Sequence, residues 1–281
     1  MKNVSFIKSP EEVQHFINVM NESRETQEGL SLVWETDLQI LKKIIPPPLV
    51  PSGPLVMANI CYLNESDIGK DYYEGILLVP VMYNNQPFAY YLGMTIAGKS
   101  DMPVFLGREQ GGFPKKNTEG LSILRNGDYI KVSIKRHGIR FFEAEAKIGN
   151  FNHPNADKIY ENYKVDTEIP GNGVNFKYDL DYLDNTVGFT RVKLVYSATT
   201  TIYHSIEKAH ITKIKLTPSQ DDPWAELKVL QPLGAIYYKC DVVMYPAKTL
   251  LRLNPNKYAP YLFAGWDSSV LGQVYRNFKA T

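Results

Sequence analysis

The sequence predicts a mainly β protein, an antiparallel β-barrel or sandwich with peripheral helices. Segments rich in Val, Ile, Tyr and Phe recur along the chain and are separated by turn residues. Short polar turns at residues 83–86 and 136–138 join neighbouring segments in the manner of hairpins. Because strands outnumber helices and do not alternate with them as in a parallel sheet, an antiparallel arrangement is favoured.

Two helices are expected before the first predicted strand. Ser9 and Glu12 form a capping box, and apolar side chains then recur on one helical face, at Val13, Phe16, Ile17 and Met20. A second helix is expected to begin at Thr36 and to stop at the three prolines of residues 46–48. Both helices are short, so they fit the periphery of a β fold.

The strand predictions follow from apolar runs bounded by turn residues. Nine strands are expected, at residues 55–63, 75–83, 87–96, 128–136, 139–148, 189–203, 209–217, 225–231 and 234–245. Residues 130–134 alternate apolar and polar side chains, which is typical of a half-buried strand. Residues 149–188 are expected to leave the sheet as a long excursion, and residues 258–279 to be partly helical and docked on the surface.

Composition favours one domain that binds a small molecule. A chain of 281 residues, 44% hydrophobic, can bury a sizeable core, and we expect a single domain over residues 1–281. Its 31 basic and 30 acidic residues leave a net charge of +1, which gives no reason to expect nucleic acid or an anionic membrane as partner. The expected partner is a small molecule or another copy of the chain.

Neither the cysteines nor the histidines have the spacing of a metal site. Cys61 and Cys240 are far apart in the sequence, and His204 and His210 would lie about 20 Å apart on one extended strand. The N-terminal stretch lacks the apolar core of a signal peptide, and no stretch approaches the roughly 20 apolar residues that cross a bilayer. We therefore expect a cytoplasmic protein without a metal, and we expect residues 221–222 to be solvated acids.

The stretch GREQGGFPKKN, residues 107–117, places Lys115 directly beside Lys116. Adjacent lysines are usually solvated, since lysine is almost never fully buried. Here a flexible Gly-Gly pair, a stiff proline and the apolar ring of Phe113 precede them, which favours a pocket. A lysine that is desolvated and faces a second cation has a lowered pKa and carries a free amine, which attacks carbonyl groups.

These residues resemble the acetoacetate decarboxylase family. The strongest similarity is GREQGGFPKK, which is similar to the family's segment of Gly-Arg-Glu followed by an aromatic residue and Pro-Lys-Lys. TDLQILKKIIPPPL and YYEGILLVPV are similar to two further family segments, and the resemblance covers roughly residues 25–250. It implies the family fold, an antiparallel β-barrel with a cone-shaped interior, and assembly into a homo-oligomer.

The resemblance also implies roles for individual residues. Lys115 would form the Schiff base, and Lys116 would lower its pKa. Glu74 would orient the substrate or carry a proton, and Phe113 would supply apolar cover. Arg108 and Glu109 would brace the lysine loop through an ion pair.

Two positions depart from the family pattern. Gln27 stands where the family decarboxylases have an arginine, and Asn59 stands where they have a glutamate. The joint replacement leaves the net charge unchanged, but an amide cannot make the bidentate, charge-assisted contact of an arginine with a carboxylate. We expect both residues to bind substrate and to change its choice.

Three hypotheses about function follow. The first is decarboxylation of acetoacetate or a related 3-keto acid through an imine on Lys115, with no cofactor. The second uses the same imine for aldol condensation, dehydration or hydrolysis of another keto acid. The third is a barrel that binds small ligands without catalysis, with both lysines solvated.

Overall fold

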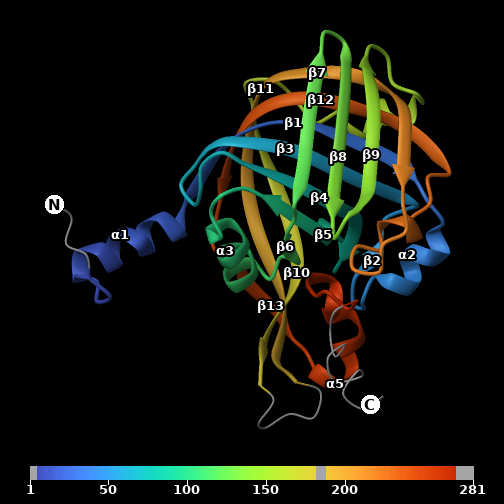
Figure 1. Cartoon of the computed structure of the whole chain (residues 1–281). Coiled ribbons are helices and arrows are strands. Elements are labelled where there is room, and N and C mark those ends of the chain that lie inside the picture. Colours follow the sequence, from blue (N-terminus) through green and yellow to red (C-terminus); the bar gives the residue numbers. More distant parts are fainter. Residues whose placement is uncertain (1–4, 182–187, 270–281) are drawn as a thin grey trace, which may run out of the picture.

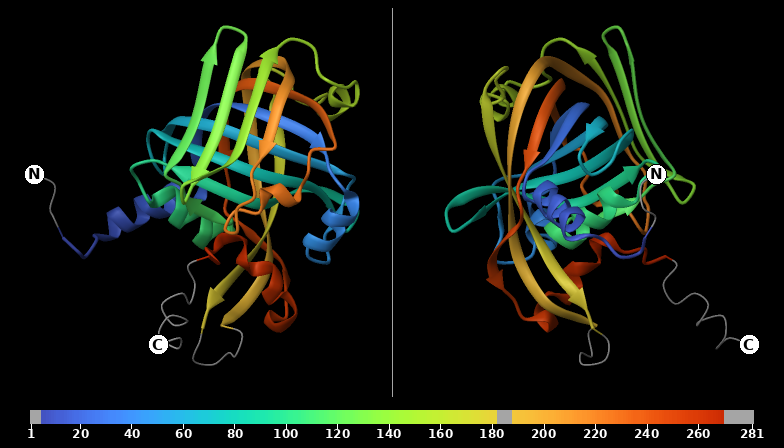
Figure 2. Two further views of the ribbon diagram at one scale, coloured as in Figure 1. Left: turned by 45° about the vertical axis from the view of Figure 1, so that its right-hand side comes forward. Right: turned by 90° about the vertical axis from the view of Figure 1, so that its left-hand side faces the viewer.

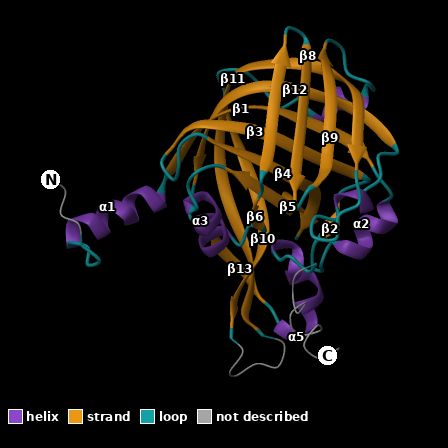
Figure 3. Cartoon of the chain, in the orientation of Figure 1, coloured by secondary structure: helices purple, strands orange, loops and turns teal. Residues whose placement is uncertain are grey.

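The computed structural model describes residues 5–181 and 188–269, and one large sheet of 13 strands dominates them (Figures 1 and 3). Its strands are β1 Ser23–Glu35, β2 Val50–Pro51, β3 Leu55–Ser66, β4 Tyr72–Tyr83, β5 Gln86–Ala97, β6 Lys115–Asn117, β7 Gly120–Asn126, β8 Tyr129–Arg136, β9 Ile139–Ile148, β10 Glu168–Leu180, β11 Phe189–Leu216, β12 Gln231–Met244 and β13 Lys248–Arg252. The prediction of a mainly β fold with few helices is confirmed.

Part of the sheet closes into a ring. The strands follow the order β10, β5, β4, β3, β1, β12 and β11, and β11 pairs again with β10. Most of these pairings are antiparallel, but β10 and β5 run parallel and share only two residue pairs, Gly173 with Ala89 and Val174 with Tyr90. From the second half of β11 the sheet continues through β9, β8 and β7, and β7 contacts β3, β4 and β5 (Figure 2).

Side-chain alternation divides the apolar residues of the ring strands into two cores. In β4, Leu77 belongs to one core with Trp34 and Ile134, while the next residue, Leu78, belongs to a second core. The second core includes Cys61 and Tyr72 and is covered by aromatic side chains from residues 149–166. Successive side chains of a strand point to opposite faces, so most ring strands contribute to both cores, while β10 contributes to the first core alone.

The helices surround the sheet: α1 Pro10–Asn21, α2 Leu38–Ile44, α3 Met102–Gly111, α4 Asn155–Ile159 and α5 Pro255–Tyr258, with 3-10 turns at Trp224–Glu226 and Ala259–Gly265. The capping box at Ser9 and Glu12 is confirmed, but α1 buries none of its residues and projects from the sheet (Figure 1). The second predicted helix is capped by Asp37 rather than Thr36, because the Asp37 side chain accepts from the Gln39 backbone N–H.

Several strand boundaries were predicted wrongly. The segments predicted at residues 189–203 and 209–217 form one strand of 28 residues, and residues 225–231 hold part of a 3-10 turn and a loop instead of a strand. The excursion predicted at residues 149–188 contains α4 and β10. No prediction covered β1, β7 or α3, whose sequences are more polar than the predicted strands. Helix α3 contains part of the GREQGG segment.

The C-terminal region is helical as far as Gly265, while the part of the predicted tail at residues 270–279 lies outside the described residues. Within residues 5–181 and 188–269, none of the helices has the length and apolar character needed to cross a membrane. Cys61 and Cys240 are both buried free thiols.

Candidate active site

The backbone around Lys115 is fixed by α3 and by the strand that follows it. The helix ends at Gly112, whose φ of 65° is a left-handed conformation that glycine adopts without strain. The chain then enters β6, where Lys115 pairs in parallel with Met94 of β5. Gly107, within α3, lies against the Lys115 side chain, and a Cβ there would be 2.5 Å from its Cδ. The glycines of the motif therefore shape the space that the lysine occupies.

Lys115 forms an ion pair with Glu74 inside the protein. Its Nζ lies 2.8 Å from Glu74 Oε1, and each residue keeps only about a twentieth of its surface exposed, 5% and 4%. Glu74 lies opposite Cys61 in the β3–β4 pairing, which places the pair beside the second core. The Phe113 ring centroid is 5.8 Å from the amine, and the ring packs edge-on against Tyr91 at 5.0 Å. The Phe113 ring therefore lies beside the amine, and its role as apolar cover for a substrate stays a prediction.

A second buried carboxylate belongs to the same cluster, and the sequence analysis did not identify it. Glu25 of β1 accepts a hydrogen bond from the Tyr72 hydroxyl at one oxygen and from the Gln27 side-chain amide at the other, each at 3.0 Å. Burial, followed by repulsion from Glu74, raises the pKa of Glu25 to about 7, while the charge of Lys115 opposes this shift. The cluster therefore holds two carboxylates whose environments differ.

The free space at the Lys115 side chain is small. The chamber has a volume of about 40 Å³, and Met20, Leu106 and Met244 are among its lining residues. Only water-sized molecules fit such a volume, so a ketone requires side chains to move, and flexible methionines allow this. A larger cavity of about 400 Å³ lies on the other side of Phe113, which lines both spaces.

The contacts of Lys116 favour a role different from the one that the family resemblance implies. Consecutive residues of β6 point to opposite faces, so Lys116 leaves the Lys115 chamber and enters a separate charged cluster. Its Nζ lies 2.9 Å from Asp222 Oδ1 and donates to the Asp221 backbone carbonyl. Lys116 is therefore paired with a buried carboxylate on another face and does not line the Lys115 chamber.

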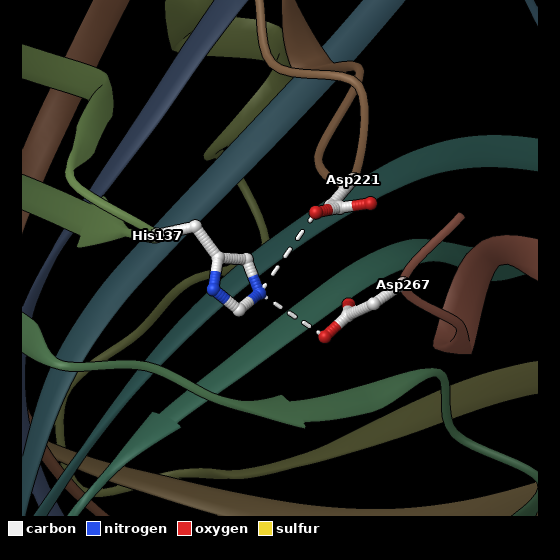
Figure 4. Close-up of side chains that lie close together, drawn as sticks. All are labelled: His137, Asp221 and Asp267. Atoms are coloured by element: carbon white, nitrogen blue, oxygen red, sulfur yellow. Dashed lines mark hydrogen bonds and ion pairs between the residues drawn. The ribbon is translucent and has the colours of Figure 1, made fainter. Parts of the chain in front are cut away.

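That charged cluster connects the β8–β9 turn to the C-terminal region. Arg136 pairs with Asp222 at 3.1 Å and with Asp267, and His137 Nε2 lies 3.1 Å from the same Asp267 oxygen (Figure 4). Burial alone would raise the pKa of Asp267, but hydrogen bonds from Arg136 and His137 lower it below its ordinary value. Residues 221–222 are thus buried and paired, not solvated as predicted.

The only group of potential metal ligands found among the described residues lies in this cluster. Ligand atoms of His137, Asp221 and Asp267 lie within 4.8 Å of one another (Figure 4). However, the two carboxylates already accept from Arg136 and from Ser269. Fixed positive charge therefore takes the place that a cation would need, and we assign no metal here.

The remaining predicted residues lie near the site, and the substrate binding expected of Gln27 and Asn59 stays a prediction. Gln27 donates to Glu25, and the buried Oδ1 of Asn59 has no hydrogen-bond partner among the described residues. Arg108 braces the lysine loop by donating to the carbonyls of Lys115 at 3.1 Å and Gly265 at 2.8 Å. No ion pair joins it to Glu109 in the described part of the chain, because Glu109 is exposed and only its backbone carbonyl is used, by Lys177.

Fold and site together define a class of protein: a mainly β chain whose ring-shaped sheet holds a buried lysine against a carboxylate. The chain belongs to the acetoacetate decarboxylase family, because the family model described as "Acetoacetate decarboxylase (ADC)" matches residues 8–252. The resemblance found in the sequence is thereby confirmed.

Known proteins agree with this assignment. The chain is 30% identical over 266 residues to a CLA biosynthesis isomerase of Lactiplantibacillus plantarum, covering 93% of this chain and 94% of the relative. Its fold is similar to acetoacetate decarboxylase from Legionella pneumophila, with a TM-score of 0.70, 20% identity and coverage of 83% and 88%. It is also similar to the enduracididine biosynthesis enzyme MppR complexed with pyruvate, with a TM-score of 0.63, 14% identity and coverage of 82% and 90%.

Proposed function

We propose that this chain is an enzyme in which Lys115 forms an imine with the carbonyl carbon of a small ketone or keto acid. The observation that carries the proposal is the buried ion pair of Lys115 with Glu74, beside a small chamber that Lys115 lines. Proton transfer within this pair leaves a neutral amine, which is the form that attacks a carbonyl carbon. Family membership supports the same chemistry.

The imine activates the carbon next to the carbonyl group. The amine adds to the carbonyl, water leaves, and the protonated imine can accept the electron pair of a bond that breaks at the neighbouring carbon. Glu74 lies close enough to the amine to receive and return protons during these steps. Positive charge thus forms on nitrogen where the electron pair arrives.

Decarboxylation of acetoacetate or a related 3-keto acid is one outcome of this chemistry. In that reaction the carbon–carbon bond to the carboxylate breaks, carbon dioxide leaves, and protonation of the enamine followed by hydrolysis releases a ketone. The family supports it. The two carboxylates near Lys115 oppose it, since they repel a substrate carboxylate and Gln27 supplies no positive charge.

Isomerisation of an unsaturated ketone is the second candidate. Here the bond that breaks is a carbon–hydrogen bond, and the substrate needs no carboxylate beside the reacting carbon. The relative named as an isomerase matches nearly the whole length of both chains, which favours this reading. Aldol condensation or dehydration of a keto acid such as pyruvate stays a third outcome of the same imine, supported by the likeness to MppR in fold alone.

Borohydride trapping tests the imine itself. The protein is incubated with acetoacetate or, in parallel, allyl methyl ketone, reduced, and mapped by mass spectrometry. We expect an added mass on Lys115 with at least one of the two compounds and none in Lys115→Met. A folded wild-type protein that gains no adduct on Lys115 would overturn the proposal. It would leave the alternative of a non-catalytic binding barrel.

Release of carbon dioxide then separates the outcomes. A wild-type protein that traps acetoacetate and releases carbon dioxide faster than buffer is a decarboxylase. Trapping of acetoacetate without faster release would contradict the decarboxylase proposal and leave imine formation intact. The matched control is Lys116→Met, which removes a neighbouring lysine that lies outside the chamber.

We further propose that the protein acts in the cytoplasm and as a homo-oligomer. The two buried free thiols, Cys61 and Cys240, support a reducing compartment. The exposed apolar side chains of α1, which include Phe16 at 49% exposure, support packing against another copy.

A further inference from the structure

We propose that Glu25 is a second proton-carrying catalytic residue, and that with Glu74 it moves a proton between the α and γ carbons of a β,γ-unsaturated ketone held on Lys115. This inference rests on the proposed imine. It adds a residue that the family resemblance did not supply and a substrate class, ketones with a carbon–carbon double bond one carbon removed from conjugation.

The Glu25 carboxyl group is held in one orientation. Tyr72 donates to one oxygen and Gln27 to the other, so neither carboxyl oxygen is free to rotate away. The Tyr72 hydroxyl can accept as well as donate, so the carboxyl keeps a hydrogen bond in either protonation state. A proton-transfer group needs this kind of fixed support.

The surroundings of Glu25 differ from those of Glu74. Glu74 is in contact with the Lys115 cation at 2.8 Å, whereas Glu25 contacts only a hydroxyl and an amide among the described residues. The titratable groups that face Glu25 are Glu74 and Tyr72 from β4, Lys115 from β6, Cys61 from β3 and Cys240 from β12.

Of these groups only Lys115 is a cation. The thiols and Tyr72 stay neutral near pH 7, since burial raises the pKa of each. The site therefore contains one carboxylate paired with a cation, Glu74, and one that takes up a proton near neutrality, Glu25. Two carboxyl groups in such different surroundings suit a base and an acid.

The proposed step balances in protons and electrons. In the protonated imine, ionised Glu74 takes a proton from the α carbon, and the electron pair of that bond forms a dienamine while the iminium charge is neutralised. Protonated Glu25 then donates its proton to the γ carbon, the double bond moves into conjugation, and the iminium forms again. Hydrolysis releases the conjugated ketone, and a proton passes from Glu74 to Glu25 through Tyr72 or solvent.

The test compares Glu25→Gln with wild type on allyl methyl ketone in deuterium oxide. Glu25→Asp serves as the conservative variant. Glu28→Gln is the matched control, because Glu28 is also on β1 but accepts from Tyr237 on the other face. Three readouts are followed for each: borohydride trapping on Lys115, deuterium exchange at the α carbons, and deuterium in the new terminal methyl group of the conjugated product.

We expect Glu25→Gln to keep trapping and α exchange while deuterium delivery to the γ carbon falls about 100-fold or more, with Glu25→Asp partly active and Glu28→Gln unchanged. Isomerisation by Glu25→Gln at the wild-type rate would overturn the proposal. So would a folded Glu25→Gln that loses trapping, since Glu25 would then serve imine formation. A wild type that traps the ketone without isomerising it contradicts this inference alone, whereas a wild type that traps nothing contradicts the proposed function itself.

Discussion

Gly107 leaves the space that the Lys115 side chain fills, and this contact gives a sharp prediction. In Gly107→Ala the new Cβ would lie 2.5 Å from Lys115 Cδ and 2.7 Å from Cε, so the amine must move. Alanine is otherwise favoured in a helix by about 1 kcal/mol, so the variant should stay folded. We expect borohydride trapping on Lys115 to slow about 100-fold, since small displacements of reacting groups have effects of that size.

The control for this variant is Gly53→Ala, because nothing lies within 4 Å of a Cβ built at Gly53. The control should trap at the wild-type rate. Equal trapping by Gly107→Ala and wild type would show that the lysine does not depend on this contact.

Lys116 is predicted to act on stability and not on the reactivity of its neighbour. In Lys116→Met the buried Asp222 carboxylate loses one of its two cationic partners and keeps Arg136. Removing one member of a buried pair typically costs about 3 kcal/mol, and chemical denaturation should show a loss of that order. The pH profile of Lys115 modification, measured on the folded variant, should stay at its wild-type midpoint. A higher midpoint in Lys116→Met would show that the charge of Lys116 does act on Lys115 and would contradict this prediction.

Lys115 and Glu74 could be found in the sequence, whereas Glu25 could not. The spacing of GREQGGFPKK and its resemblance to a family identified Lys115 and Glu74 as candidates. Glu25 lies in the stretch SRETQEG, residues 23–29, whose composition is typical of a polar loop because it contains no large apolar residue. Only the folding of β1 between β3 and β12 brings Glu25 and Gln27 to the buried cluster of Tyr72, Glu74 and Lys115. Because residues 23–28 are all polar, they show no alternation that would have predicted a strand there.

At the scale of elements, α1 is unusual because its apolar face is uncovered. Val13, Phe16 and Ile17 keep 46%, 49% and 43% of their surface exposed, although the helix is well capped. We expect the triple change to serine to leave the unfolding midpoint of the protein unchanged and to lower the mass of a homo-oligomer in analytical ultracentrifugation. Changing Glu11 and Gln14 to serine on the same helix is the control. An unchanged mass in the triple variant would exclude α1 as the contact.

Composition predicted strand positions correctly where each strand corresponds to one apolar run. The prediction failed where contacts distant in the sequence determine the backbone conformation. The long strand β11 contains Ser205, Glu207 and Lys208 in its middle, which read as a break between two strands. Pairing with β12 across this stretch keeps it extended despite its polarity. In contrast, residues 225–231 are apolar enough for a strand, but Pro223 and the buried Trp224 turn the chain there. Propensity is a weak guide when cross-strand pairing or a buried aromatic determines the backbone.

For the whole molecule, buried Glu25 predicts how stability depends on pH. Its pKa of about 7 in the folded protein exceeds the ordinary value of 4.5, so the folded state holds the proton more tightly. The stabilising contribution is complete below pH 4.5 and declines as the pH rises to about 7. In calorimetry, the stability of wild type relative to Glu25→Gln should fall in this window by up to about 1.4 kcal/mol per pH unit.

The same experiment tests the domain organisation. A single domain over residues 1–281 predicts one cooperative transition at each pH. Two separate transitions would contradict it. A pH-independent difference between wild type and Glu25→Gln would show that Glu25 does not hold a proton more tightly in the folded state.

The ring of strands has one weak junction, between β5 and β10. Every other junction in it is a long antiparallel ladder, whereas β5 and β10 meet through only two residue pairs, beside Tyr90 and Tyr91. The ring is therefore weakest between β5 and β10, and a local separation of these two strands breaks few hydrogen bonds. Tyr91 packs on Phe113, the ring that divides the lysine chamber from the larger cavity. A transient separation of β5 from β10 would let the Phe113 ring move and would admit a ketone to a chamber that otherwise holds little more than water.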